Sequence, residues 1–318
     1  AAFLKKTFPG KNIVVIESPD YPTIGVGEST FVSIAQFRDY LGIDEKDFMK
    51  ECDATYKMSV KFTDFYEKDS GAFHYPFRTP FFEGTNNGLV DWLEAKAYYP
   101  DLDVNDFARS YFPSAAMYEN NKFTDEHYGS FGNWNKQTDV AYHFDSTKFG
   151  LWLKENYCLP LGVKLIQSTV VDIDNSDKGI ESITLSTGEK IKSDLFVDCT
   201  GFKSLLLGEN MSEPFYSYSD MLPNDYAWAV KVPYKDKEKE LEPYTNCTAI
   251  DNGWCWNIPL WSRLGTGYVY SDKFVDKEKA LQEFKAYLKS NKITIPRTDD
   301  DIENLNFKEI TMRVGIHK

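Results

Sequence analysis

Hydrophobic and polar residues along the chain follow two periods, one typical of strands and one typical of helices. Four β-branched residues at 13–16 predict a buried strand, and residues 29–42 and 44–52 show the spacing of helices. Ser29 or Thr30 is expected to cap the first of these helices. The opening of the chain therefore alternates strand and helix, as α/β folds do.

Residues 55–65 alternate apolar and polar side chains, which predicts one strand. One face would carry Tyr56, Met58, Val60 and Phe62, and the other Lys57, Ser59, Lys61 and Thr63. A charged strand face is typical of solvent contact, although a lysine there could also project into an aromatic pocket. A loop rich in glycine, proline and aromatic residues is expected over 70–90, and polar helices over 91–126.

The second half of the chain continues this mixture. The pattern predicts a capped helix over 141–157, strands that include 165–174 and 194–199, a hairpin that turns near 263–265, and a helix over 276–290. Together these elements predict a mixed α/β nucleotide-binding domain with an inserted, aromatic-rich helical region. The helix-like start and the uncapped, strand-like end lead us to expect a piece of a longer protein.

Composition narrows the range of functions. The chain has 318 residues, of which 42% are hydrophobic and 16% aromatic, enough for a large core. A net charge of −13 argues against nucleic acid and anionic lipid as partners, because both attract clustered Lys and Arg. Apolar runs fall short of the ~18 residues of a membrane span, and no secretory signal opens the chain.

The five cysteines lie far apart in the sequence, without any CxxC pair. This spacing indicates neither a disulfide framework nor a structural zinc site, and we expect no metal. A reducing cytoplasm is the compartment that such cysteine usage predicts.

Three segments carry residues suited to binding a nucleotide. Glu17 ends the strand at 13–16, where dinucleotide-binding folds place a carboxylate on a ribose hydroxyl, although any strand can end in an acid. "IGVGES" (24–29) spaces two glycines before a predicted helix, which suits a close backbone approach to a ligand and equally a structural turn. "SDLFVDCTGF" (193–202) ends in a Thr-Gly turn, which is either a cofactor contact or a plain corner.

Two tryptophans form a further candidate feature. Trp254 and Trp256 share one face of the predicted strand "WCWNIP", which Pro259 ends. Such a pair is typical of an aromatic core, of a sugar platform or of the wall of a flavin tunnel.

Taken in order, these segments resemble the flavin-dependent halogenase family, of which the tryptophan halogenases are the familiar members. The resemblance runs through nearly the whole chain. It rests on "IESPDYPTIGVGEST", "LGIDEKDFMKECDATYKMSVKF", "FHYPF", "YHFDSTKF", "DLFVDCTGFKSLL" and "GTGYVYS". The most specific stretch is "WCWNIP", which fits the W-x-W-x-I-P signature of the family.

The resemblance implies roles for individual residues. Lys57 corresponds to the catalytic lysine and Glu17 to the ribose acid. Contacts with the flavin are implied for the strap residues Gly25, Val26, Gly27 and Glu28, and for Val171, Thr200, Gly201 and Phe202. Trp254, Trp256, Ile258 and Pro259 would line the flavin tunnel, and Tyr75 and Phe77 the substrate pocket.

The fold that the resemblance implies is an FAD-binding, Rossmann-like α/β fold of the GxGxxG flavoprotein monooxygenase type, with an aromatic-rich, mostly helical substrate region. Residues 1–66 and 140–275 would form the FAD-binding domain, and residues 67–139 and 276–318 the substrate region. This sequence lacks the family's N-terminal glycine motif and its later segment with a catalytic glutamate and halide site. We therefore expect the substrate region to be truncated at its C-terminus.

The activity implied is halogenation of an electron-rich aromatic substrate. FADH2, supplied by a separate flavin reductase in a transient contact or by free diffusion, would react with O2 and a halide ion to give hypohalous acid. Lys57 would hold this acid by a hydrogen bond or bind the halogen as a haloamine. Tyr75 stands where indole-specific members have histidine, and the loop at 70–90 offers mainly ring surface. A neutral arene is therefore expected in preference to free tryptophan.

Two other classes of function stay open. An FAD-dependent aromatic monooxygenase, a hydroxylase, would share the fold but would not require Lys57 or the tryptophan pair. A non-enzymatic, aromatic-rich module that binds, for example, a glycan would leave Glu17 and the strap unexplained. Flavin absorbance separates the binding module from the two enzymes, and halide dependence of the product mass separates the enzymes from each other.

Overall fold

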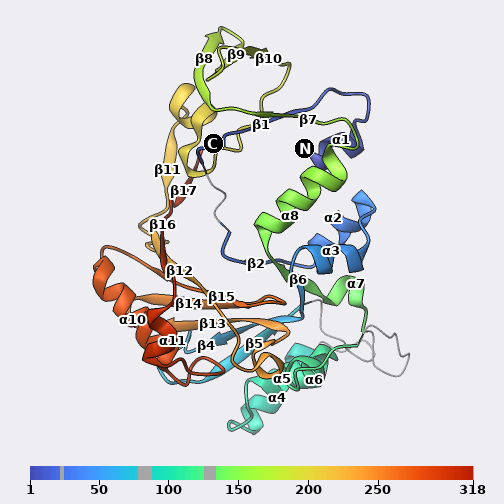
Figure 1. Cartoon of the computed structure of the whole chain (residues 1–318). Coiled ribbons are helices and arrows are strands. Elements are labelled where there is room, and N and C mark those ends of the chain that lie inside the picture. Colours follow the sequence, from blue (N-terminus) through green and yellow to red (C-terminus); the bar gives the residue numbers. More distant parts are fainter. Residues whose placement is uncertain (22–24, 78–87, 125–133, 318) are drawn as a thin grey trace.

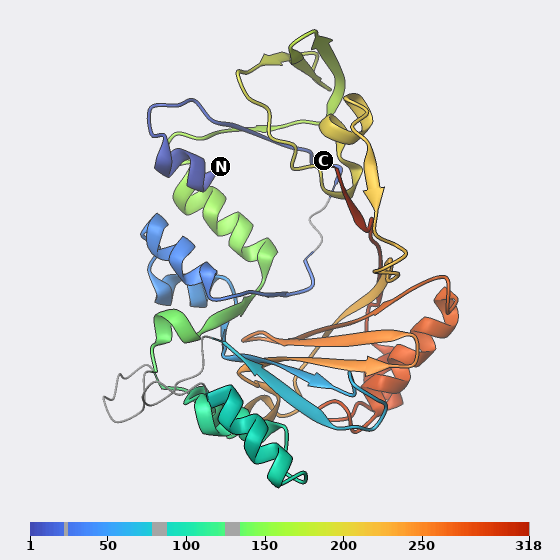
Figure 2. The ribbon, with the colours of Figure 1, turned by 180° about the vertical axis from the view of Figure 1, so that it is seen from behind.

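The computed structural model describes residues 1–21, 25–77, 88–124 and 134–317 (Figure 1). These residues form five β-sheets flanked by short helices, and the prediction of a mixed α/β fold is confirmed. The largest sheet lies at one end of the molecule and a small three-stranded sheet at the other, as the view from behind also shows (Figure 2).

The end of the molecule with the small sheet contains three separate sets of strands. β1 (Val14–Glu17) pairs in parallel with β7 (Lys164–Gln167), while β8 (Val170–Ser176), β9 (Gly179–Leu185) and β10 (Lys190–Lys192) form an antiparallel sheet, and β11 (Phe215–Ser217) pairs with β17 (Gly315–His317). Strands were expected over 13–16 and 165–174. The first is present as β1, whereas the second divides between β7 and β8, which belong to different sheets. The first is less buried than expected, because Val14 is 41% exposed.

Seven strands form the largest sheet, which contains one parallel pair. Their order is β16 (Lys308–Thr311), β12 (Tyr226–Val232), β15 (Leu264–Tyr270), β14 (Gly253–Pro259), β13 (Tyr244–Ile250), β4 (Ser59–Thr63) and β5 (Ala72–Pro76). β13 and β4 run parallel, whereas the other neighbours are antiparallel. The predicted hairpin is the β14–β15 pair.

The main core lies between this sheet and α10 (Lys277–Lys289), the helix predicted over 276–290. Ala280, Phe284 and Leu288 follow one another at intervals of four residues and are fully buried. This spacing places them on one helix face, against Tyr268 of the sheet. α11 (Asp299–Glu303) lies beside α10 in both views (Figures 1 and 2).

A second three-stranded sheet joins segments from three parts of the chain. Its order is β2 (Glu28–Ser29), β6 (Ala141–Phe144) and β3 (Thr55–Lys57), both pairs being antiparallel. All four residues of β6 are buried. The end of the strap and the lysine strand β3 therefore pair with opposite edges of β6.

The remaining elements are short helices. They are α1 (Ala2–Thr7), α2 (Ser33–Leu41), α3 (Glu45–Glu51), α4 (Gly88–Tyr98), α5 (Asn105–Tyr111), α6 (Ser114–Tyr118), α7 (Lys136–Asp139), α8 (Ser146–Trp152) and α9 (Lys237–Glu240). α8 continues as a π-helix over Leu153–Cys158, Gly201–Lys203 forms a 3₁₀ turn, and Leu205–Asn210 forms a second π-helix. None of the helices in the described ranges has the length and apolar character that a membrane crossing requires.

The prediction of a strand over 194–199 is wrong. No described strand pairs with this segment, and Leu195 and Val197 are 71% and 60% exposed. A strand requires a neighbour that satisfies its backbone N–H and C=O groups, and an apolar pattern does not supply that neighbour.

The helix predicted over 29–42 begins later than expected, at Ser33. The two candidate caps are used elsewhere, because the Ser29 hydroxyl bonds to Thr245 and the Thr30 hydroxyl donates to the Tyr142 carbonyl. The helix predicted over 44–52 is present as α3.

The strand predicted over 55–65 divides between two sheets. Met58 leaves both ladders, and its N–H donates to the Pro243 carbonyl at 2.8 Å. β3 before it pairs with β6, whereas β4 after it pairs with β13 and β5. The alternation is therefore retained along the chain, but Lys57 and Lys61 belong to different sheets.

Two segments form strands that the pattern did not predict. Residues 72–76 form β5 inside the expected loop, and residues 141–144 form β6 where a helix was expected to begin. Asp145 then caps α8, its carboxylate accepting from the Lys148 N–H at 3.1 Å. Residues 78–87 of the expected loop lie outside the described ranges.

The largest sheet combines strands from both predicted regions. β5 belongs to residues 67–139 and β16 to 276–318, whereas the other five strands belong to the predicted FAD-binding domain. The two predicted regions thus share one sheet. Which of them binds the flavin and which the substrate stays a prediction.

Candidate active site

Lys57, the last residue of β3, is almost fully buried, with 2% of its surface exposed. Its Nζ donates to the Thr30 carbonyl oxygen at 2.8 Å, and it lies 5.2 Å and 5.0 Å from the ring centroids of Phe31 and Phe77. The expectation of a solvated strand face is therefore wrong at Lys57. Its amine is enclosed by the end of the strap segment and two aromatic rings.

Burial lowers the pKa of Lys57 to about 8, because the ammonium loses its water, and the neighbouring Cys247 opposes part of the shift. At pH 7 about a tenth of such amines are neutral. Lys61 has other surroundings, since its amine lies 5.7 Å from the Tyr244 ring. The two lysines that the alternation placed on one face are thus held differently.

The strap, residues 25–28, lies directly against the start of α8. A Cβ added to Gly25 would come within 2.4 Å of the Thr147 hydroxyl oxygen. Glu28 accepts a hydrogen bond from the Ser146 N–H at 2.9 Å. Carboxylates are favoured at a helix N-terminus, so this contact fixes the end of the strap on α8.

The β14–β15 turn holds the strap from its other side. A Cβ on Gly265 would lie 2.4 Å from the Val26 carbonyl oxygen, which also accepts from Arg263 Nη1 at 3.3 Å. Arg263 is fixed by a largely buried ion pair with Asp145, at 2.8 Å. Gly27 adopts φ +108°, a conformation that L side chains rarely take. Close packing at Gly25 and the positive φ of Gly27 therefore explain why glycine is needed at these positions, even without a ligand.

The two tryptophans lie on β14, beside the strap. Their ring centroids are 6.2 Å apart, and Trp256 packs with Ile258 in a cluster that Val26 joins. A Cβ on Gly267 would come within 2.2 Å of the Trp256 ring, so the indole occupies a slot that only glycine leaves open. Trp256 Nε1 is buried and has no hydrogen-bond partner among the described residues.

A second group of predicted residues lies at the other end of the molecule. Glu17 ends β1 and forms an ion pair with Lys154 at 3.3 Å. The Thr200–Phe202 turn is close to the segment that follows Glu17, because Lys203 Nζ lies 5.7 Å from the Tyr21 ring centroid. The contact links the residue after the turn to Tyr21, four residues beyond Glu17.

Val171 borders the same turn. A groove of about 290 Å³ lies between β8 and the second π-helix, lined by Val170, Val171, Asp172, Ile173, Lys203, Leu205, Glu209 and Asn210. Val171 is 61% exposed, which leaves apolar surface at this groove open, and Phe202 of the neighbouring turn is 51% exposed.

The two predicted substrate-pocket residues lie differently. Phe77 is buried and contacts both the Lys57 amine and, at 6.2 Å between ring centroids, Phe31. Tyr75 is 62% exposed on β5, opposite Val60. Phe77 is thus the one of the pair that the structure places beside the lysine.

Sequence reasoning missed several residues around Lys57. Thr30 and Phe31 directly follow the strap, and Arg263 lies in the predicted hairpin turn. His143 and Thr245 form a hydrogen-bonded group with Ser29 behind the lysine strand. The only available signals were the position of Thr30 after the strap and of His143 within "YHFDSTKF".

A family model described as "Tryptophan halogenase" matches residues 1–301. The chain belongs to the tryptophan halogenase family. The fold and the order of the motifs agree with this membership, and the suspected resemblance is confirmed.

Two curated relatives show how the tryptophan halogenase match extends. The chain is 34% identical to "Tryptophan 7-halogenase RebH" of Lentzea aerocolonigenes, over 89% of this chain and 55% of that protein. It is 32% identical to "Tryptophan 6-halogenase ThaL" of Streptomyces albogriseolus, over 99% of this chain and 59% of that protein. The chain thus spans less than two thirds of the length of these relatives.

Two solved structures have the same fold as this chain. The tryptophan 6-halogenase SttH of Streptomyces toxytricini superimposes with a TM-score of 0.85 at 31% identity, covering 100% of this chain and 60% of that one. The "VirX1 apo structure" superimposes with a TM-score of 0.90 at 38% identity, covering 99% of this chain and 59% of that one.

Three features of the described residues fit FAD, the cofactor that a flavin-dependent family implies. Glu17 stands at the carboxyl end of a parallel strand, where a ribose-binding acid is expected. Gly201 has φ +65° in an exposed turn, so its backbone is open to a ligand. The buried Trp256 Nε1 offers an unused donor beside the strap.

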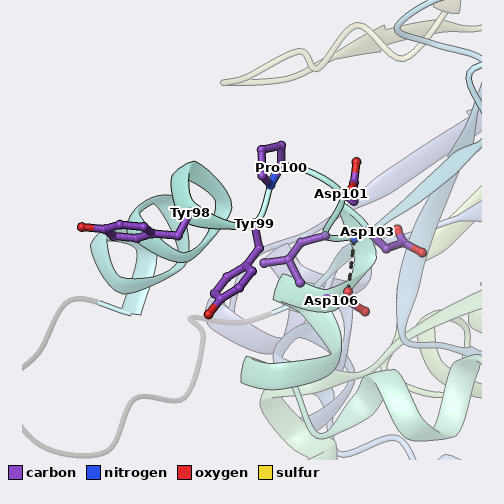
Figure 3. A pocket seen from close by; sticks show the side chains of 7 residues that line it. Tyr98, Tyr99, Pro100, Asp101, Asp103 and Asp106 are labelled. Carbon is purple, nitrogen blue, oxygen red and sulfur yellow. Dashed lines mark hydrogen bonds between the residues drawn. The ribbon is translucent and has the colours of Figure 1, made fainter.

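A further hollow of the described surface involves none of the predicted site residues. It measures about 540 Å³ and is lined by Tyr98, Tyr99, Pro100, Asp101, Leu102, Asp103 and Asp106 (Figure 3). The Asp106 carboxylate accepts from the Asp103 N–H at 3.2 Å, which fixes the start of α5. This hollow is therefore a helix junction apart from the candidate active site.

We predict that Lys57→Met changes how stability depends on pH. The folded-state pKa of about 8 lies below the ordinary value of 10.5. The unfolded chain therefore binds more protons between these values, and wild-type stability rises with pH there. The advantage of Lys57→Met should be largest below pH 8 and shrink by about 3 kcal/mol towards pH 10.5. Urea unfolding at several pH values measures this difference, and a constant difference would contradict it.

We predict that Gly265→Ala destabilises the protein by about 2 kcal/mol, because the added methyl group would meet the Val26 carbonyl. Gly150→Ala is the matched control, since its Cβ meets nothing within 4 Å and the position is helical. That control should gain about 0.5–1 kcal/mol. Chemical denaturation of both variants tests the pair, and equal stability of the two would refute the close contact.

Proposed function

We propose that the protein that contains this chain is an FADH2-dependent halogenase of an electron-rich aromatic substrate, with Lys57 as a catalytic residue. The observation that carries the proposal is the buried Lys57 amine, held by the Thr30 carbonyl between the rings of Phe31 and Phe77. A lysine desolvated in this way keeps a reactive neutral fraction near neutral pH, and aromatic walls suit a flat arene.

Bound FAD, reduced by a separate flavin reductase, would supply the oxidation of a halide ion by O2 to hypohalous acid. The neutral Lys57 amine then attacks the halogen of that acid. A nitrogen–halogen bond forms, the oxygen–halogen bond breaks, and hydroxide leaves with the amine proton as water. The arene next takes the halogen from nitrogen, and the ring proton that it loses returns to the amine.

Lys57 could also assist the transfer of halogen to the arene without binding the halogen itself. As an ammonium it can donate a hydrogen bond to hypohalous acid and so polarise the oxygen–halogen bond while the arene attacks. The Thr30 carbonyl restricts where the amine can point in either form. Exclusion of water by the surrounding rings would protect both reagents from side reactions.

We further propose that residues 1–66 and 140–275 bind FAD and that residues 67–139 and 276–318 serve the substrate. The flavin contacts would be Glu17, Gly25, Val26, Gly27, Glu28, Val171, Thr200, Gly201 and Phe202. Trp254, Trp256, Ile258 and Pro259 would line the route between the flavin and Lys57. The contact between Val26 and the Trp256 cluster supports this arrangement, because it joins the strap to the tryptophan strand.

The proposed substrate is a neutral phenol, indole or heteroarene. The rings of Phe31 and Phe77 beside the Lys57 amine suit stacking and offer no partner for an amino-acid carboxylate. The curated relatives are named for tryptophan, whereas this pocket supports an uncharged ring. Arg78 and Glu83, the charged residues of the expected loop, lie outside the described ranges.

We predict that Lys57→Ala in the full-length protein abolishes halogenated product while NADH consumption through the partner reductase continues. Flavin oxidation does not need this amine, so only the transfer of halogen to the arene is lost. Lys61→Ala is the control, because Lys61 belongs to β4 and contacts Tyr244. Product mass spectrometry with bromide measures the outcome. Full halogenation by Lys57→Ala would refute the assignment, and hydroxylated product without halide would favour the monooxygenase.

We predict that uncharged indole outcompetes free tryptophan when both are supplied equally with bromide. The expected cause is the cost of burying the ammonium and carboxylate of tryptophan against aromatic walls. The ratio of the two brominated products gives the answer, and an excess of bromotryptophan would show that the pocket is built for the amino acid.

A further inference from the structure

A chain of hydrogen bonds runs behind Lys57 and is centred on His143, which is fully buried on β6. His143 Nδ1 lies 3.1 Å from the Thr55 hydroxyl, and its Nε2 lies 2.9 Å from the Thr245 hydroxyl. The chain continues beyond both neighbours. Thr55 donates to the Pro259 carbonyl at 2.6 Å, and Thr245 lies 2.6 Å from the Ser29 hydroxyl.

The carbonyl at one end fixes the direction of every proton in this chain. A carbonyl only accepts, so the single hydroxyl proton of Thr55 points to Pro259. Thr55 must then accept from His143, which places a proton on Nδ1. Nε2 is left as an acceptor in the neutral ring, so Thr245 donates to it and in turn accepts from Ser29.

His143 is held in the neutral form. Burial lowers its pKa well below the ordinary value, the nearby Lys57 charge acts in the same direction, and a hydrogen bond with the Pro259 backbone opposes part of the shift. The other members of the chain are three hydroxyls and a carbonyl, and none of them carries a charge. No carboxylate among the described residues bonds to the ring.

The members of the chain come from several segments near the lysine. Ser29 directly follows the strap, Thr55 is two residues before Lys57, and Pro259 ends the tryptophan strand. Thr245 lies on β13, which pairs with β4. His143 also stands opposite both Ser29 and Thr55 in the β2-β6-β3 sheet.

We propose that His143 is a positioning residue, a neutral Nδ1–H imidazole whose one-way hydrogen-bond chain sets the Lys57 strand against the strap and the tryptophan strand. The inference rests on the proposed function for its catalytic consequence. The tautomer and the placement of the amine can be tested without any catalytic assay. His143 itself does not touch the reacting atoms.

The first test is nitrogen NMR of the full-length protein labelled with ¹⁵N-histidine. The chain has four histidines, and comparison with His143→Asn assigns the signal of His143. The expected signal is a neutral ring protonated at Nδ1, at pH 7. An Nε2–H tautomer or an imidazolium would overturn the inference.

The second test removes one hydroxyl from the chain. Thr245→Val leaves Nε2 without its donor and keeps the shape of the side chain, whereas Thr245→Ser restores the hydroxyl. Thr248→Val is the matched control, because Thr248 is fully buried on the same strand but is not part of the chain. Thr245→Val should lose about tenfold in halogenated product per NADH consumed, the factor expected for one lost hydrogen bond. Thr245→Ser and Thr248→Val should stay close to wild type.

A readout without catalysis accompanies these variants. The ¹³C resonance of the Lys57 ε-carbon reports its titration, which in Thr245→Val should move to higher pH because a displaced amine regains water. Equal effects of Thr245→Val and Thr245→Ser, or an unchanged Lys57 titration in Thr245→Val, would overturn the positioning role. If the wild-type protein halogenates no arene, the proposed function fails, and the tautomer and the Lys57 titration still decide this inference.

Discussion

The backbone of β6 pairs on both edges, with β2 on one side and β3 on the other. Because β2 and β3 both pair with β6, this one strand fixes the strap and the lysine strand relative to each other. The Thr30 N–H and hydroxyl both bond to the Tyr142 carbonyl of β6, which brings the Thr30 carbonyl to the Lys57 amine. The burial of that amine, and with it the lowered pKa, depends on this pairing more than on any contact of Lys57 itself.

Close backbone packing is the second constraint on the site. Gly25 meets Thr147, and Gly265 meets the Val26 carbonyl, at distances that leave no room for a side chain. The strap is thereby fixed between α8 and the β14–β15 turn. A glycine-spaced motif that reads as a nucleotide-binding loop thus has a complete structural explanation in contacts within the protein. The flavin contacts proposed for the same residues would be additional to that role.

Local patterns predicted the elements whose period and caps agree with their surroundings. The helix at Lys277–Lys289 and the β14–β15 hairpin fall where the pattern placed them. The pattern could not show that Met58 divides one alternation between two sheets, because the Pro243 carbonyl that receives its N–H lies far away in the sequence. It likewise gave Leu195 and Val197 the signal of a strand, although no strand in the described part of the chain pairs with them.

The residues of the candidate site were likewise predictable only in part. Lys57, Phe77 and the strap were identified through motifs, and the structure places them together. Thr30, His143 and Thr245 had no motif of their own, since hydroxyls and a buried histidine acquire meaning only through partners. Their geometry depends on contacts between distant parts of the chain, which no local period encodes.

The parallel pairing of β4 with β13 has a consequence for how the protein is made. Ser29 and Thr245 bond across 216 residues, and His143 and Thr245 across 102. During synthesis the ribosome releases the strap and the lysine strand long before β13 exists, so the enclosure of Lys57 is a late event. Until then the apolar faces of β3 and β4 have no cover, and contacts of such long range form slowly. Until β13 emerges, the nascent chain is therefore expected to depend on molecular chaperones.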